Sequence, residues 1–116
     1  MVYEIIESDW KLLRRLHRVA LDRFCRHVIE EISAVTSDRA DDYNECFLRV
    51  FALVNERNRE LACTFDDLRR SNAVILLAGL MERGLLSEEE FSQFGQQTRD
   101  AVEVILRLRG AASTSR

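Results

Sequence analysis

Hydrophobic residues recur every three or four positions along most of this chain, a spacing that predicts amphipathic helices. The predicted helices cover about residues 9–35, 41–62, 65–83 and 88–109. Short polar breaks separate them, and helices joined by such short connections pack as antiparallel neighbours. The pattern therefore predicts an all-α fold, a four-helix antiparallel bundle with short loops.

Residues that favour helix ends lie at the predicted boundaries. Side chains able to cap a helix N-terminus occur at Ser8 or Asp9, at Thr64, and at Ser87 with Glu90 in capping-box spacing. Gly84 follows the third predicted helix, where glycine adopts the left-handed conformation at little cost, so Leu85 and Leu86 should fold back onto that helix. The segment Glu82–Phe91 resembles the short helical hairpin of a small C-terminal module found in many bacterial proteins, and this resemblance implies no function.

The second and third predicted helices carry more apolar side chains than one helix face can bury. Their apolar runs are Cys46–Val54 and Ala73–Met81, and neither run leaves the charged face that a surface helix normally presents to water. The expected inner stripe of the second helix is Phe47, Val50, Phe51 and Val54. Large apolar side chains left outside such stripes would form an exposed patch, and a patch of this kind marks an interface.

This surplus predicts a homodimer built on the second and third helices. The candidate interface consists of Leu48, Leu53, Ile75, Leu76, Gly79 and Leu80. A two-fold dimer is the commonest way to cover such a surface. The alternative is that the first and fourth helices cover the middle pair completely within one chain.

Length and composition place the chain among ordinary globular proteins. A chain of 116 residues with 47% hydrophobic and 32% charged residues predicts one domain, residues 1–110, with a mobile tail at 111–116. The chain contains no proline, which suits a nearly all-helical protein with short connections. The longest apolar run is about half the ~20 residues of a membrane span, and no secretory signal is visible. We therefore expect a soluble cytoplasmic protein that makes no membrane contact.

The first predicted helix has a basic face, although the net charge of the chain is −3. The candidate surface for an anionic partner is Lys11, Arg14, Arg15, Arg18 and Arg26, with Arg23 on the same helix. Arginines along one helix could follow the phosphates of a nucleic acid. No nucleic-acid-binding motif accompanies them, so the alternative is a solvated face whose side-chain stems cover the bundle.

The sequence contains no recognisable catalytic, metal or cofactor motif. Cys25, Cys46 and Cys63 are far apart and form no Cys-x-x-Cys pair, which is typical of reduced thiols in the cytosol. His17 and His27 are ten residues apart, and the chain lacks the Glu-x-x-His pairs of di-iron bundles. We therefore expect no metal, no cofactor and no enzymatic activity.

A group of polar residues lies on the two middle helices at similar distances from their connection. The group is Asn55, Asn58, Arg59 and Glu60 in the second helix and Arg69, Arg70, Ser71 and Asn72 in the third. These side chains could form a hydrogen-bond network that fixes the register of two helices. Equally, they could line a polar cleft that holds a small ligand.

Together these patterns predict a non-enzymatic helical-bundle protein that acts through protein–protein contacts, as an adaptor, a regulator or a small chaperone. The alternative is a nucleic-acid-binding regulator that uses the arginine-rich face of the first helix. A small-molecule-binding bundle that uses the polar group is a third and more remote interpretation.

Overall fold

The computed structural model describes residues 3–38 and 42–114. Its elements in chain order are α1 (Glu7–Thr36), α2 (Tyr43–Phe65), the single-turn 3-10 helix η1 (Arg70–Asn72), α3 (Ala73–Glu82), α4 (Glu88–Phe91) and α5 (Gln96–Thr114). These ranges contain no strand, so the all-α prediction is confirmed there. They contain five α-helices where four were predicted.

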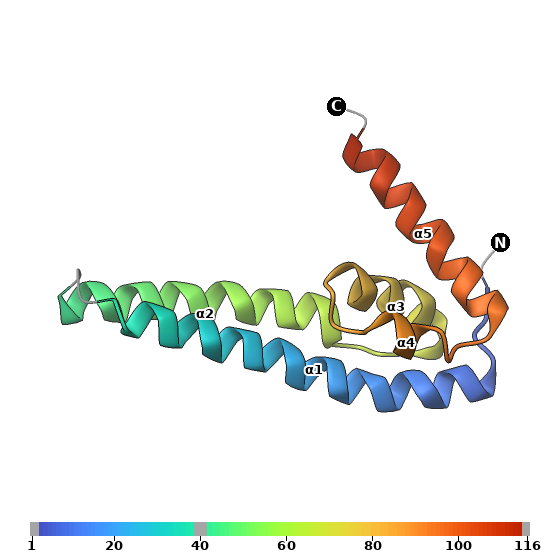
Figure 1. Cartoon of the computed structure of the whole chain (residues 1–116), viewed down its shortest axis with the longest axis horizontal. Coiled ribbons are helices and arrows are strands. Elements are labelled where there is room, and N and C mark those ends of the chain that lie inside the picture. Colours follow the sequence, from blue (N-terminus) through green and yellow to red (C-terminus); the bar gives the residue numbers. More distant parts are fainter. Residues whose placement is uncertain (1–2, 39–41, 115–116) are drawn as a thin grey trace.

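The helices form two parts that differ in how many neighbours each helix has (Figure 1). α1 and α2 lie antiparallel, side by side, as a long hairpin, while α3 and α4 pack beside the N-terminal half of α1 and α5 leans away. We call residues 25–36 of α1 and 43–61 of α2 the distal hairpin, and the remainder the lobe. The radius of gyration is 17.2 Å, whereas a compact chain of this length has about 13 Å. The extended hairpin explains the difference.

The hydrophobic core lies in the lobe. Its buried members are Ile5, Leu12, Leu13, Leu16, Ala20, Phe24, Phe65, Ala73, Val74, Leu77, Ala78, Leu80, Leu85, Leu86, Phe91, Phe94 and Val102. Each large apolar side chain removed from water in this way contributes roughly 1.5–3 kcal/mol. Of the 23 residues of α2, only Thr64 and Phe65 in the last turn are buried. The core therefore holds the lobe together and reaches only the base of the hairpin.

The second helix ends later and the third begins later than the sequence predicts. Thr64 was expected to cap the third helix, but it is buried in the last turn of α2. Asp67 then adopts a left-handed conformation with φ 64°. The Asn72 amide donates to the Asp67 carbonyl at 2.8 Å, and its oxygen accepts from the Arg69 N–H at 2.9 Å. These bonds hold residues 66–72 as a connection, so α3 begins at Ala73 instead of residue 65.

The predicted fourth helix is two helices, because the chain breaks between α4 and α5. Asp9 was expected to cap its own helix, but its buried carboxylate instead accepts from the Gly95 N–H at 3.1 Å and the Thr98 hydroxyl at 2.6 Å. The Tyr3 hydroxyl lies 2.9 Å from Thr98 Oγ1 and donates to it, since Thr98 gives its hydrogen to Asp9. A Cβ at Gly95 would lie 3.2 Å from Asp9 Oδ2, so glycine permits this approach.

The end of α5 also differs from the prediction. The helix continues through Gly110 to Thr114, beyond the predicted end at residue 109. The predicted mobile tail, 111–116, therefore begins inside a helix, and its last two residues lie outside the described ranges.

The turn between α3 and α4 matches its prediction. Gly84 has φ 70°, and the Leu85 N–H donates to the Leu80 carbonyl at 3.0 Å, which completes a glycine-terminated helix end. Leu85 and Leu86 fold back and are buried. The Ser87 and Glu90 side chains form the predicted reciprocal capping box.

Arg23 of α1 fastens this turn to the first helix. Its guanidinium donates to both carboxylate oxygens of Glu90, at 2.7 and 2.8 Å, and to the Leu85 carbonyl at 2.9 Å. The charged hydrogen bonds from Arg23, together with those from Ser87, lower the pKa of Glu90 to about 2. Arg23 is therefore a structural residue of the lobe and is not available to the basic face.

Candidate interaction surface

The two helices of the hairpin meet along a seam with coiled-coil spacing. On α2 the half-buried residues Cys46, Val50, Leu53 and Arg57 recur at intervals of four, three and four positions. The Cys46 thiol lies 3.9 Å from the Val35 carbonyl of α1, which places this end of the seam. One pair of helices thus buries one narrow stripe on each partner.

One side of the seam is closed by charged groups. Arg57 makes two hydrogen bonds to the Glu31 carboxylate of α1, at 2.9 and 3.1 Å, and it also pairs with Glu60. Arg83, which follows α3, reaches Glu60 at 3.2 Å. Hydrogen bonding from Arg57 lowers the pKa of Glu31, and hydrogen bonding to Glu31 raises the pKa of Arg57. This side of the hairpin is therefore tied to the lobe by ion pairs.

The opposite side of the seam is apolar and open. Phe47 and Phe51 of α2 are 65% and 58% exposed, and Ile29 of α1 is 63% exposed. The two phenylalanine rings stack with their centroids 6.4 Å apart. Val54 continues the stripe along α2, because residues three and four positions apart share a helix face. These apolar side chains are thus exposed to water, and burying them would be favourable.

A groove of about 250 Å³ runs along this apolar side, between α1 and α2. Its lining consists of Phe24, Cys25, Val28, Ile29, Ile32, Val54, Arg57, Asn58 and Leu61. Val54 belongs to both the groove and the stripe of Phe47 and Phe51, so the two features are continuous. We call Cys25, Ile29 and Ile32 of α1, together with Phe47, Phe51, Val54 and Leu61 of α2, the open face.

The open face corrects the assignment of the inner stripe on the second helix. Phe47, Phe51 and Val54 were expected to point inward, but all three are exposed. Val50 of that stripe is half-buried at the seam, and so is Leu53, which was expected to be surplus. The physical reason is that α2 packs against α1 alone over the distal hairpin, so only the narrow seam is covered.

The six residues of the candidate interface lie in different environments and do not form one patch. Leu80 is fully buried in the lobe and contributes to the core. Leu53, Leu76 and Gly79 are half-buried, whereas Leu48 on the hairpin and Ile75 on α3 are exposed. Leu48 lies on α2, which also carries Phe47 and Phe51, but it points to a different side of that helix from the open face.

Ile75 borders a second apolar hollow in the lobe. This hollow, of about 370 Å³, lies between α3 and α5 beside the N-terminal segment and is lined by Tyr3, Ser71, Val74, Ile75, Ala101, Val104 and Ile105. Its exposed members are Ser71, Ile75 and Val104. It is separate from the open face, because none of its lining residues belongs to the hairpin.

The predicted polar group is divided between two places. Asn55, Asn58 and Arg59 are exposed on α2, while Arg69 and Asn72 close the connection before α3. Arg70 pairs with Glu7 at 2.8 Å. The predicted network across the two middle helices is therefore wrong for these residues, although Glu60 does reach Arg83.

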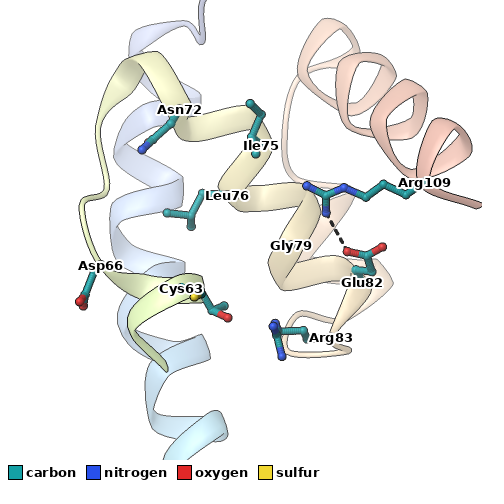
Figure 2. Close-up of a pocket in the computed structure, with 10 residues that line it drawn as sticks. Cys63, Asp66, Asn72, Ile75, Leu76, Gly79, Glu82, Arg83 and Arg109 are labelled. Carbon is teal, nitrogen blue, oxygen red and sulfur yellow. Dashed lines mark hydrogen bonds and ion pairs between the residues drawn. The ribbon is translucent and has the colours of Figure 1, made fainter. Parts of the chain in front are cut away.

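A polar hollow of about 270 Å³ lies where the end of α2 faces α3 (Figure 2). Cys63 and Asp66 border it on the α2 side, and Glu82 pairs with Arg109 of α5 at 2.7 Å on the other side. Thr64 Oγ1 is buried beside it and has no hydrogen-bond partner among the described residues. The two arginines that border the hollow, Arg83 and Arg109, already pair with Glu60 and Glu82, so neither offers a free cation to a ligand.

The basic face is exposed on α1 within the lobe. Lys11, Arg14, Arg15 and Arg18 surround a shallow hollow of about 220 Å³. Lys11 lies 4.0 Å from Glu7, and Arg26 pairs with Glu30 at 3.2 Å farther along the helix. Arg14, Arg15 and Arg18 make no ion pair within the part of the chain that the structure describes. The structure therefore brings four of the five predicted cations together.

The thiols and imidazoles are dispersed. Cys25 and Cys63 are exposed and Cys46 is half-buried, all three as free thiols. His17 Nε2 lies 3.0 Å from the Phe65 carbonyl and its ring packs edge-on against the Phe65 ring, which ties α1 to the end of α2. Residues 3–38 and 42–114 contain no group of three side chains suited to a metal ion. No helix in those ranges combines the length and the hydrophobicity that a membrane span requires.

Comparison with known proteins adds no relative. No family model matches the chain, and neither a curated protein nor a solved structure matches it.

Proposed function

We propose that this protein is a non-enzymatic helical protein that acts through protein–protein contacts, as an adaptor, a regulator or a small chaperone. The observation that supports the proposal is the open face: stacked Phe47 and Phe51 stand in water beside an apolar groove. Aromatic side chains next to a pocket are the usual energetic centre of a protein interface. Exposed apolar surface of this extent marks an interaction site.

The two sides of the hairpin also support a one-sided contact. Ion pairs of Arg57 and Arg83 occupy one side, where a partner would have to displace charged groups. Of the residues that line the groove on the apolar side, Arg57 alone is charged, and it already pairs with Glu31 and Glu60, so a partner can cover the open face without stranding a charge. The contact therefore belongs to the apolar side.

Site-specific photo-crosslinking in the native cell tests this proposal. A photoreactive phenylalanine analogue at Phe51 is expected to capture a defined protein partner. The same analogue at Leu108 of α5 is the matched control, because Leu108 is a comparably exposed apolar side chain outside the open face. The proposal is wrong if both positions give the same products, or if neither gives a product.

A second candidate function, nucleic-acid binding, is favoured by the hollow among Lys11, Arg14, Arg15 and Arg18. Guanidinium groups without protein carboxylate partners can release counterions from phosphates, which gives binding that weakens steeply with salt. A mobility shift compares Arg14→Glu/Arg18→Glu with the charge-matched pair Arg59→Glu/Arg107→Glu. If the protein binds nucleic acid through this hollow, binding should weaken with salt and should be lost only in Arg14→Glu/Arg18→Glu. An equal loss of binding in both double variants would contradict this candidate.

A further inference from the structure

We infer that the occupant of the open face is a second copy of this chain, whose hairpin packs antiparallel to form a four-helix bundle. This inference rests on the proposed function, because it names the partner for the same surface.

The exposed area fits a dimer. Phe47, Phe51, Val54 and Ile29 of the open face, together with Tyr43 four residues before Phe47, are each 43–90% exposed. At ~150–250 Å² for a full aromatic side chain and somewhat less for an aliphatic one, they present on the order of 600 Å². A standard stable interface buries about 800 Å² on each partner. The exposed Cys25 and half-exposed Ile32 and Leu61 in the groove supply much of the remainder.

The groove is large enough for an aromatic ring. Its volume is about 250 Å³, and an apolar cavity of about 150 Å³ holds a benzene molecule. The lining is almost wholly apolar, with Arg57 already held by Glu31 and Glu60. A phenylalanine side chain from another molecule would therefore be buried there without leaving a charge unpaired.

The positions of the Phe47–Phe51 ring pair and of the groove along α2 make the open face self-complementary. Along α2 the rings centre near residue 49, and the groove, from Val54 to Leu61, centres between residues 57 and 58. At ~1.5 Å per residue these centres lie about 13 Å apart. A two-fold axis beside residues 53 and 54 exchanges them, so the ring pair of each copy packs against the groove of the other. Such reciprocal contact is what a closed two-fold dimer requires.

Within residues 3–38 and 42–114, no other helix covers the open side of the distal hairpin and competes with this arrangement. In Figure 1 the lobe packs at one end of the hairpin and α5 leans away from it. Two helices alone bury only a seam, whereas four helices enclose a core. The antiparallel pair would thus give the distal hairpin the two neighbours that it lacks within one chain.

Light scattering and cysteine cross-linking of the full chain test the inference. We expect a dimer at tens of micromolar, and we expect Phe51→Glu to weaken it about 100-fold or more, because a carboxylate would enter an apolar groove. Leu108→Glu adds the same charge on α5 and should leave the molecular mass of the dimer, measured by light scattering, unchanged.

The cross-links test the direction of packing. In a background with Cys25→Ser and Cys63→Ser, Val54→Cys should form an intermolecular disulfide, because the axis brings the two copies of residue 54 together. Leu48→Cys, on the same helix with similar exposure but a different side, should not. Tyr43→Cys should not either, since antiparallel hairpins hold the two tips apart; a parallel pair would join them.

Each outcome decides the inference. A dimer that Phe51→Glu dissociates and that only Val54→Cys cross-links supports it. A monomer at 100 micromolar overturns it, as does a dimer that survives Phe51→Glu or that cross-links through Tyr43→Cys. If the chain is monomeric but photo-crosslinking at residue 51 captures another protein, the proposed function stands without the self-pairing; if both fail, both are wrong.

Discussion

The lobe and the distal hairpin both contain helices with large apolar side chains, but those side chains are buried in the lobe and exposed in the distal hairpin. In the lobe, Leu13, Leu77 and Val102 are completely buried. In the distal hairpin, Phe47 and Phe51 stand largely in water. An apolar side chain of this protein is therefore buried where several helices surround it and exposed where its helix has one neighbour.

α1 makes the contrast within a single helix. Its N-terminal half buries Leu12, Leu13, Leu16 and Ala20 against the lobe. Its C-terminal half continues the apolar spacing with Val28, which lies at the margin of the core, and with Ile32 beyond it, and both remain half-exposed. The same sequence pattern thus gives a buried core at the N-terminal end of α1 and a partly exposed apolar stripe at its C-terminal end.

The largest expected effect on stability is that of a substitution at a buried position of α3, compared with one at an exposed position of the same helix. Leu77→Ala should lower the free energy of unfolding by about 3 kcal/mol, because it opens a cavity in the lobe. Ile75→Ala, two positions away and mostly exposed, should cost well under 1 kcal/mol. Urea unfolding measures both. Equal losses would mean that α3 is not buried as the structure describes.

Asp9→Ala should produce the next largest loss, about 2 kcal/mol, because it removes the carboxylate that accepts from the half-buried Gly95 N–H and the buried Thr98 hydroxyl. The loss should be concentrated in α5, where hydrogen exchange should accelerate while the hairpin keeps its protection. Asp22→Ala, an exposed carboxylate on the same helix, is the control. Uniform acceleration across the chain would contradict a local capping role.

Glu90→Gln should lower the free energy of unfolding by about 1 kcal/mol at neutral pH. The effect is modest because Arg23 is partly exposed, so water weakens the ion pair. The folded pKa of Glu90, about 2, lies below its ordinary value of 4.5. Its contribution is therefore present above pH 5 and lost as the pH falls toward 2. The difference in unfolding free energy between wild type and Glu90→Gln should shrink over that interval. A difference that is constant from pH 7 to pH 2 would rule out this ion pair.

The smallest effect is expected at the open face in dilute solution. At submicromolar concentration, where self-association is weak, Phe51→Ser should change the unfolding free energy by less than about 0.5 kcal/mol. The ring is mostly exposed in a single chain. Thermal unfolding at two concentrations checks this, with Leu108→Ser as the control. A dilute-solution loss of 2 kcal/mol would show that Phe51 is covered within one molecule.

Much of the fold follows from local chemistry that the sequence displays. The all-α class, the Gly84 turn and the Ser87–Glu90 capping box depend on residues close together in the chain, and they were predicted correctly. The break before α5 was not, because it depends on Asp9, which lies 86 residues from Gly95. The delayed start of α3 depends on a left-handed Asp67, for which the apolar pattern gives no signal.

The open face could be predicted only in part. The surplus of apolar side chains on the second helix was visible, but assigning it to the correct side required knowing how many helices cover the hairpin. The spacing of Cys46, Val50, Leu53 and Arg57 was a usable signal for a two-helix seam. It competes with the equally regular spacing of Phe47, Phe51 and Val54, and periodicity alone does not choose between them.

Hydrogen exchange measured as a function of protein concentration tests most directly whether a second chain completes the distal hairpin. If a second chain completes it, amides of residues 43–58 should gain protection as the concentration rises from submicromolar to 100 micromolar, while amides of α3 keep constant protection. Protection of residues 43–58 that is the same at every concentration would contradict completion by a second chain.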